Sequence, residues 1–309
     1  MKGKFKRFKH DMHRDWQLYL FLLLPVCYIV IFAYVPMGGL VIAFEDYSVR
    51  KGLFGSEWVG FDNFIKFFKS YQFGRVLKNT LILSLYSIIA GFPLPIIFAL
   101  FLNSLKGDRF KKVVQAIVCL PHFISVTVMV GILFQILHSR SGLYGMIGME
   151  LLGKYPSDLF ASPSAFRHIY VLSGVWQGFG WGSIVYIAAL ANVPPEYHEA
   201  AQLDGATRFQ RIIQVDLPTI LPSIIIMLIL KMGTIMNMRY EKILLMQNDL
   251  NISASEVIST YVYQVGLAAT GQSDFSYATA IGCFNSVINL IMITLVNKIS
   301  SKVSETSLW

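Results

Sequence analysis

Residues 16–44 read WQLYLFLLLPVCYIVIFAYVPMGGLVIAF, a stretch without Asp, Glu, Lys or Arg. A helix needs roughly 20 apolar residues to cross the hydrocarbon core of a bilayer, and this stretch is longer. It is also too long for the apolar part of a secretory signal, and no small-residue cleavage site follows it. We therefore predict a retained first membrane span. The segment before it is basic, with Lys2, Lys4, Lys6, Arg7, Lys9 and Arg14.

The rest of the chain repeats this pattern. Hydrophobic residues make up 55% of the sequence and charged residues 14%, and the mean hydropathy is +0.56. Such a composition lies outside the range of ordinary soluble proteins. The further candidate spans are 77–105, 113–137, 169–193, 220–245 and 277–299. The sequence thus predicts an all-α integral membrane protein with about six transmembrane helices.

The distribution of Lys and Arg predicts the orientation, because positively charged loops stay on the cytoplasmic side. The basic segment 1–15 and the loop 106–112, KGDRFKK, are both rich in positive charge. With six spans, both termini and the loop 194–219 are then cytoplasmic. We expect a membrane domain over 16–300 and a cytoplasmic tail over 301–309. The net charge of +8 is explained by this topology, and we expect no nucleic-acid partner.

The sequence offers little that would support catalysis or metal binding. Cys27, Cys119 and Cys283 each fall in an apolar stretch and lack disulfide or metal spacing. The close pair His10 and His13 lies in the charged N-terminal segment. No set of His, Asp, Glu or Cys side chains recurs at one membrane depth, so we expect neither a membrane enzyme nor a metal site.

The loop 194–219 has the signals of two short helices. Pro195 suits the first position of a helix, which predicts a helix over 196–204. Gly205 can take the left-handed conformation that ends a helix. Thr207 and Gln210 have the spacing of a capping box, which starts a second helix.

Leu217-Pro218 is expected to close this second helix and return the chain to the bilayer. The small side chains of Ala200 and Ala201 leave a shallow surface, and Glu199 offers a charge for pairing. The alternative is that the loop is only a connector between two spans.

These residues carry a resemblance to a known family. Glu199-Ala200-Ala201, then Gly205, then Val215 and Leu217-Pro218 are similar to the Glu-Ala-Ala (EAA) signature of permease subunits of binding-protein-dependent ABC importers. Val215 departs mildly from the Ile that is usual in the family. The likeness extends over most of the chain and resembles the carbohydrate-uptake branch, in particular permeases for complex oligosaccharides. It includes 59–64, Asn79-Thr80, Leu120-Pro121, 246–248, 257–263, 276–280 and the terminal 307–309.

The resemblance implies the type I permease fold of ABC importers in the bacterial cytoplasmic membrane. It implies four partners: a second permease subunit, two ATPase subunits, and an extracytoplasmic binding protein that delivers an oligosaccharide. The chain has no phosphate-binding loop of its own, so ATP and Mg²⁺ are expected on the ATPase subunits. The implied ATPase-coupling residues are Glu199, Ala200, Ala201, Asp204, Gly205, Arg208, Leu217 and Pro218.

The route of the solute is predicted from polar groups within the spans, because such groups usually face a cavity or a neighbouring helix. Lys231 within the fifth span is the strongest candidate, and structural pairing is the alternative. Asn285 and Asn289 share one face of the last span, and interhelical hydrogen bonding is the better-supported interpretation of this pair. The other candidates are Asn237, Arg239, Tyr240 and Glu241 further along the fifth helix, and Trp176, Gln177, Trp181 and Tyr186 on the fourth.

Each of these groups has an ordinary structural alternative. Arg239 and Glu241 can pair with each other, and the aromatic side chains can belong to a membrane-interface belt or to the core. A stand-alone secondary transporter remains a competing function, although it leaves the loop 194–219 unexplained. If the basic groups of the fifth span face the cavity, a fragment of an acidic polysaccharide is one possible solute.

Overall fold

A computed structural model describes residues 14–105, 107–267, 273–303 and 307–308. The basic residues at positions 2–9 and the pair His10 and His13 lie outside these ranges. The chain divides into two compact units. The first comprises Met1–Phe68 and Val265–Cys283, and the second comprises Lys69–Gln264 and Phe284–Trp309.

The first unit contains the predicted first span. Helical structure runs from α2 (Trp16–Ile29) through a π-helical turn (Val30–Tyr34) and α3 (Val35–Met37) to a 3₁₀ segment (Gly38–Phe44). The span 16–44 is confirmed, and no residue of α2 is buried. An outward face of this kind suits a helix that meets lipid or another subunit.

A small polar framework follows this span in the same unit. The strand β1 (Glu45–Asp46) pairs antiparallel with β2 (Glu57–Trp58). The amide of Asn63 on α4 (Asp62–Lys69) donates to the carbonyls of Ala43 and Glu45, at 3.1 Å each. Lys66 Nζ lies 2.8 Å from Asp274 Oδ2. The Asn63 contacts hold the short helix α4 against the end of the first span, and the Lys66 contact links it to Asp274, which directly precedes residue 275.

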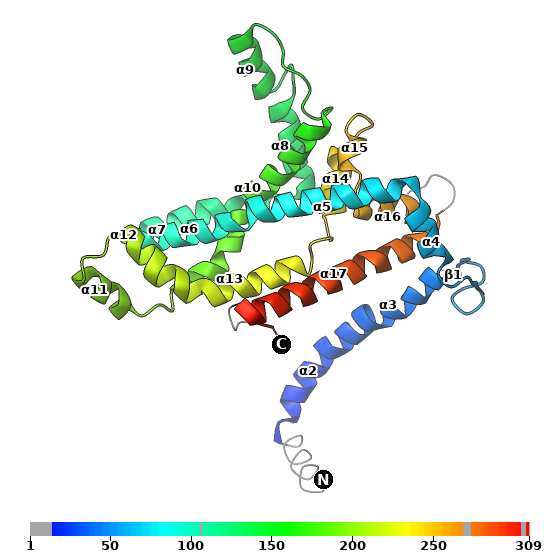
Figure 1. Ribbon diagram of the computed structural model, residues 1–309, viewed down its shortest axis with the longest axis horizontal. Helices are drawn as coiled ribbons and strands as arrows, with labels where there is room; N and C mark the ends of the chain where they lie inside the picture. Colours follow the sequence, from blue (N-terminus) through cyan, green and yellow to red (C-terminus); the bar gives the residue numbers. More distant parts are fainter. Residues whose placement is uncertain (1–13, 106, 268–272, 304–306, 309) are drawn as a thin grey trace. The chain divides into compact units, whose positions relative to one another are not determined.

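The second unit is built around α10 (Pro163–Leu190), which packs against α5 (Tyr71–Gly91) and α6 (Pro93–Ser104). The helix α10 also approaches α7 (Asp108–Cys119) closely. This approach requires a glycine at position 180, because a Cβ on Gly180 would lie 2.2 Å from the carbonyl oxygen of Val118. Figure 1 shows α9 (Leu143–Leu152) at the end of α8 (Val126–Leu137), away from α5 and α6.

The remaining helices of the second unit connect these longer ones. They are α7 (Asp108–Cys119) with a 3₁₀ turn (Leu120–Phe123), α11 (Pro195–Leu203), α12 (Arg208–Arg211) with a π-helical segment η4 (Ile212–Asp216), α13 (Leu217–Met232), α14 (Tyr240–Met246), α15 (Ile252–Ser255), α16 (Ile258–Gly266) and α17 (Phe275–Val303). The ends of α16 and α17 also enter the first unit.

Four helices among the described residues are long and apolar enough to cross a membrane, and a bent pair makes a fifth. The helix α10, with 28 residues, is not among them because Gln177 and several Gly and Ser residues make it more polar. Its burial between other helices makes an apolar surface unnecessary. The predicted all-α membrane fold is confirmed, with the number of spans approximate.

The predicted third span, 113–137, is not one straight helix. It bends by 96° between residues 108–123 and 126–137. Pro121 enters the 3₁₀ turn, and the Ser125 hydroxyl accepts from Val128 N to start α8. The amide of Gln177 donates to the carbonyl of Ile124 at 2.8 Å, so a side chain from α10 satisfies the backbone at the bend.

The predicted fifth span was wrong at its far end. The helix α13 stops at Met232, residues 233–236 form turns, and residues 237–239 have no regular structure before α14 begins at Tyr240. Asn237, Arg239, Tyr240 and Glu241 are therefore not on the helix that carries Lys231. Apolar composition alone predicted continuity, because Ile235, Met236 and Met238 look like span residues.

The broken segment is held by asparagine side chains of α17. Asn289 Oδ1 accepts from the backbone N–H of Met236 at 3.0 Å. The amide nitrogens of Asn289 and Asn285 both donate to Asn237 Oδ1, at 2.9 and 3.0 Å. The expected hydrogen bonding of Asn285 and Asn289 to another segment is confirmed, although their partner is a break rather than a helix.

We expect the substitution Asn289→Leu to destabilise the protein by about 1–2 kcal/mol, because Met236 N–H loses its partner in a water-poor environment. Thermal unfolding of the purified protein in lipid nanodiscs measures this effect. Asn285→Leu is the matched control: it removes one bond to Asn237 and leaves Met236 N–H satisfied. Equal stability of the Asn289→Leu variant and the wild type would contradict the role of this side chain.

Candidate functional site

The loop 194–219 has the local structure that its sequence predicts up to residue 211. Pro195 occupies the first turn of α11, and Gly205 has a φ of +80°. Thr207 N donates to Gln210 Oε1 at 2.7 Å, and Gln210 N donates to Thr207 Oγ1 at 3.3 Å. The capping box that begins α12 is therefore confirmed.

The expected end of this second helix at Leu217-Pro218 was wrong. The chain continues from α12 through η4 directly into α13, as one apolar span over Arg208–Met232. Pro218 lacks a backbone N–H, and the π-helical turn before it absorbs the missing bond without ending the helix. Leu217 and Pro218 thus lie on the first turn of a membrane helix. The part of the loop that stands outside the span is therefore shorter than predicted.

The outer face of this loop is uncovered. Glu199, Ala200, Asp204, Gly205, Arg208 and Pro218 are exposed, and Ala201 and Leu217 are half-buried. Large apolar side chains accompany them: Leu203 is 90% exposed, Phe209 62% and Tyr197 57%. Apolar surface of this kind beside charged groups is typical of a docking site for another protein.

The inner side of the loop packs on the membrane helices. Ile212 and Ile220 are buried in a cluster with Ala99 and Leu100 of α6 and Tyr186 of α10. The loop is therefore anchored on one side and free on the other. In Figure 1, α11 and α12 lie at the opposite end of α6 and α13 from α14 and α15.

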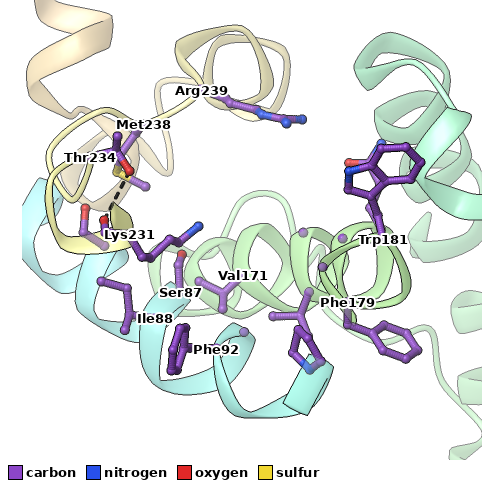
Figure 2. Close-up of a pocket in the computed structure, with 18 of the residues that line it drawn as sticks. Ser87, Ile88, Phe92, Val171, Phe179, Trp181, Lys231, Thr234, Met238 and Arg239 are labelled. Carbon is purple, nitrogen blue, oxygen red and sulfur yellow. Dashed lines mark hydrogen bonds between the residues drawn. The ribbon is translucent and has the colours of Figure 1, made fainter. Parts of the chain in front are cut away.

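The second unit also contains a cavity of about 420 Å³ between α5, α10 and the broken segment after α13. Figure 2 shows Lys231 and Arg239 projecting into this space from one side and Trp181 from another. The predicted residues that line it are Lys231, Asn237, Arg239, Gln177, Trp181 and Tyr186. The helix break and α10 bring together side chains that are distant in the sequence.

Other predicted path residues lie away from this cavity. Tyr240 stacks on Tyr263 with ring centroids 5.4 Å apart. Trp176 is 49% exposed on α10, and Glu241 is exposed on α14. No ion pair joins Arg239 to Glu241 in the described part of the chain. Asn285 serves the break through its bond to Asn237.

Sequence reasoning missed three cavity residues. Lys242 is 4% exposed, and its Nζ donates to the Tyr170 carbonyl at 2.8 Å. His122 stacks on Trp181, with centroids 4.5 Å apart and rings 4° from parallel. Ser84 presents a buried hydroxyl for which the described residues supply no hydrogen-bond partner. The run Arg239 to Lys242 was a visible signal, but continuity of the helix was assumed there.

Comparison with known proteins now identifies the family. Residues 91–305 match the model of the family described as binding-protein-dependent transport system inner membrane component. LplB of Bacillus subtilis (strain 168) is 41% identical over 298 residues, covering 96% of this chain and 92% of LplB. The polygalacturonan/rhamnogalacturonan transport system permease protein YteP of the same organism is 37% identical over 308 residues, covering 100% of this chain and 95% of YteP.

Two crystal structures give the same answer. A chain of a bacterial ABC transporter involved in the import of the acidic polysaccharide alginate superimposes with a TM-score of 0.86 and 38% identity, covering 96% of this chain and 99% of the other. A chain of the alginate transporter in complex with an alginate pentasaccharide-bound periplasmic protein also gives 0.86 and 38%, covering 98% and 100%. A stand-alone secondary transporter is accordingly not favoured. This chain belongs to the binding-protein-dependent transport system inner membrane component family, and it is a permease subunit of an ABC importer, a transport component rather than an enzyme.

Proposed function

We propose that this chain pairs with a second permease to import an oligosaccharide, and that two ATPase subunits drive it through the loop 194–219. The observation that carries the proposal is the uncovered outer face of α11 and α12, on a loop whose inner face is anchored to the membrane helices. A surface of this kind can transmit the movement of a docked partner to the spans.

The proposed topology places this loop in the cytoplasm of a bacterium. The basic segments 1–15 and 106–112 support a cytoplasmic N-terminus and second loop. The tail 301–309 lies on the same side, and the membrane domain covers 16–300. ATP and Mg²⁺ bind the ATPase subunits, and the binding protein meets the opposite side of the membrane.

The oligosaccharide assignment rests on the relatives and on the cavity. YteP is named for polygalacturonan and rhamnogalacturonan, and the structural neighbour for alginate. The cavity offers hydroxyl and amide groups of Ser87, Thr234 and Asn237, together with the indole of Trp181. Polar groups of this kind can bond sugar hydroxyls, and an aromatic face can stack on a pyranose ring.

A buried polar cluster ties the loop to the membrane helices. Asp216 is 2% exposed, and His198 Nε2 of α11 lies 3.2 Å from its Oδ1. Asn103 Nδ2 of α6 donates to the same oxygen at 3.2 Å. Lys111 Nζ of α7 donates in turn to the carbonyl of Asn103 at 3.0 Å. One carboxylate thus joins α11 to α6 and to the start of α13.

This cluster explains how docking reaches the spans. His198 precedes Glu199 in the sequence, so the inner contact and the outer docking face belong to one turn of α11. Because the Asp216 contacts couple α11 to α6 and to the start of α13, a movement of α11 by a docked partner displaces these helices together with the loop.

For the docking face, we expect Glu199→Arg to lower oligosaccharide uptake more than about tenfold, because a reversed charge in an interface costs several kcal/mol. Binding-protein-dependent uptake into membrane vesicles and co-purification of the ATPase subunits measure the effect. Gln214→Arg is the control, since Gln214 is exposed on η4, outside α11. Normal uptake by the Glu199→Arg variant would defeat the docking assignment.

For the Asp216 cluster, we expect Asp216→Leu to loosen α11, because a hydrogen bond to a buried charged group contributes about 1.5–3 kcal/mol. Amide hydrogen exchange in 195–203 should rise about tenfold or more, and less solute should be moved per ATP hydrolysed. Asp216→Asn keeps an acceptor and should restore part of this ratio. If Asp216→Leu lowers only the amount of transporter and leaves the ratio unchanged, the cluster serves folding alone.

A further inference from the structure

We infer that the cavity of the second unit selects anionic sugars, and that Lys231 and Arg239 bind the carboxylates of a uronate-containing oligosaccharide. This inference rests on the proposed function, because it names the substrate class of the same cavity. It is based on the positive charge of the cavity lining, which no acidic side chain of the lining balances. The neighbouring side chains indicate what kind of anion fits.

The lining of the cavity includes Lys231, Arg239 and Lys242 but no Asp or Glu. Within the described residues, neither Lys231 nor Arg239 forms an ion pair. Positive charges at membrane depth are costly unless a counter-charge or water accompanies them. Lys231 and Arg239, which converge on one space without an acid, therefore favour a ligand that brings its own negative charge.

The three basic side chains have different tasks. Lys242 is buried, donates to the Tyr170 carbonyl at 2.8 Å, and lies 4.8 Å from the centroid of the Tyr170 ring. Its Nζ is therefore already engaged with Tyr170. Lys231 and Arg239 project into the open space (Figure 2). These two side chains are the ones that can contact a ligand.

The guanidinium of Arg239 favours a planar, two-oxygen acceptor. Its N–H groups form a fork that matches a carboxylate in two parallel hydrogen bonds, whereas the Lys231 ammonium acts as a point charge. The non-helical residues 233–239 place Arg239 on a different segment from Lys231. Two cations on separate segments suit a chain with more than one carboxylate better than a single small anion.

Other groups on the cavity lining suit a sugar ring. His122 stacks on Trp181, which is still 47% exposed. The Ser84 hydroxyl is buried on the lining and lacks a hydrogen-bond partner among the described residues. A flat aromatic surface and an unsatisfied hydroxyl recognise the body of a pyranose, while Lys231 and Arg239 recognise its carboxylate.

The test compares two probes with the same sugar chain, one charged and one neutral: trigalacturonate and its fully methyl-esterified form. The complete transporter, with both permeases, the ATPase subunits and the binding protein, is reconstituted in liposomes, and ATP-driven uptake of each probe is measured. All variants use the same binding protein, so its own preference cancels when each variant is compared with the wild type. The quantity compared is the ratio of acid uptake to ester uptake.

In the double variant Lys231→Met, Arg239→Gln, we expect this ratio to fall about tenfold or more, because a charge-assisted hydrogen bond contributes about 1.5–3 kcal/mol. Lys231→Arg should keep the wild-type ratio. Lys154→Met is the matched control, because it makes the same chemical change at an exposed position outside the cavity lining.

The outcomes separate this inference from the proposed function. If the wild type imports oligosaccharides and the double variant keeps its ratio, or loses both probes equally, the charge assignment is overturned and the proposed function stands. If acetate or inorganic phosphate competes as well as trigalacturonate does, the site binds any anion and the sugar assignment is overturned. If the wild type imports neither probe but imports a neutral oligosaccharide, this inference is overturned and the proposed function stands. If it imports no oligosaccharide but imports another solute, both are overturned.

Discussion

The architecture depends on side-chain amides that satisfy interrupted backbone inside a membrane domain. An unpaired N–H or C=O in hydrocarbon is costly, so a helix breaks there only where another group supplies the missing bond. Asn289 does this for Met236 after α13, and Gln177 does it for Ile124 before α8. Both interruptions border the cavity, because a chain that leaves the helix at these points can turn Arg239 and His122 toward it.

The helix α13 connects the loop 194–219 to the cavity of the second unit. Its start follows Asp216, where α11 and α6 meet on one carboxylate. Its last turn carries Lys231, and the break held by Asn289 comes directly afterwards. The segment that joins the loop 194–219 to the cavity is therefore short and helical. A displacement of α11 would therefore reach the side chains that line the cavity through this one segment.

The start of the loop 194–219 was predictable because its turns depend on neighbouring residues. The ends of the membrane spans were less predictable because they depend on long-range contacts. The turn at Gly205 and the capping box of Thr207 and Gln210 need only residues that are close in sequence, and both were predicted correctly. The end of α13 at Met232 was missed because the residues beyond it are as apolar as a span. The side chain that satisfies the backbone beyond this end is Asn289, more than fifty residues further along the chain.

The sequence by itself determined that this chain is a helical membrane permease, because apolar length and the spacing from Glu199 to Pro218 are properties of the linear chain. It also marked Lys231 as unusual for a membrane span and Trp181 as a candidate aromatic group on the solute route. Only the tertiary structure decided that Lys242 and His122 join them around one cavity, and that Tyr240 and Glu241 do not. The physical reason is that helix breaks redirect the chain, and the hydrogen-bond partners that permit those breaks come from other helices.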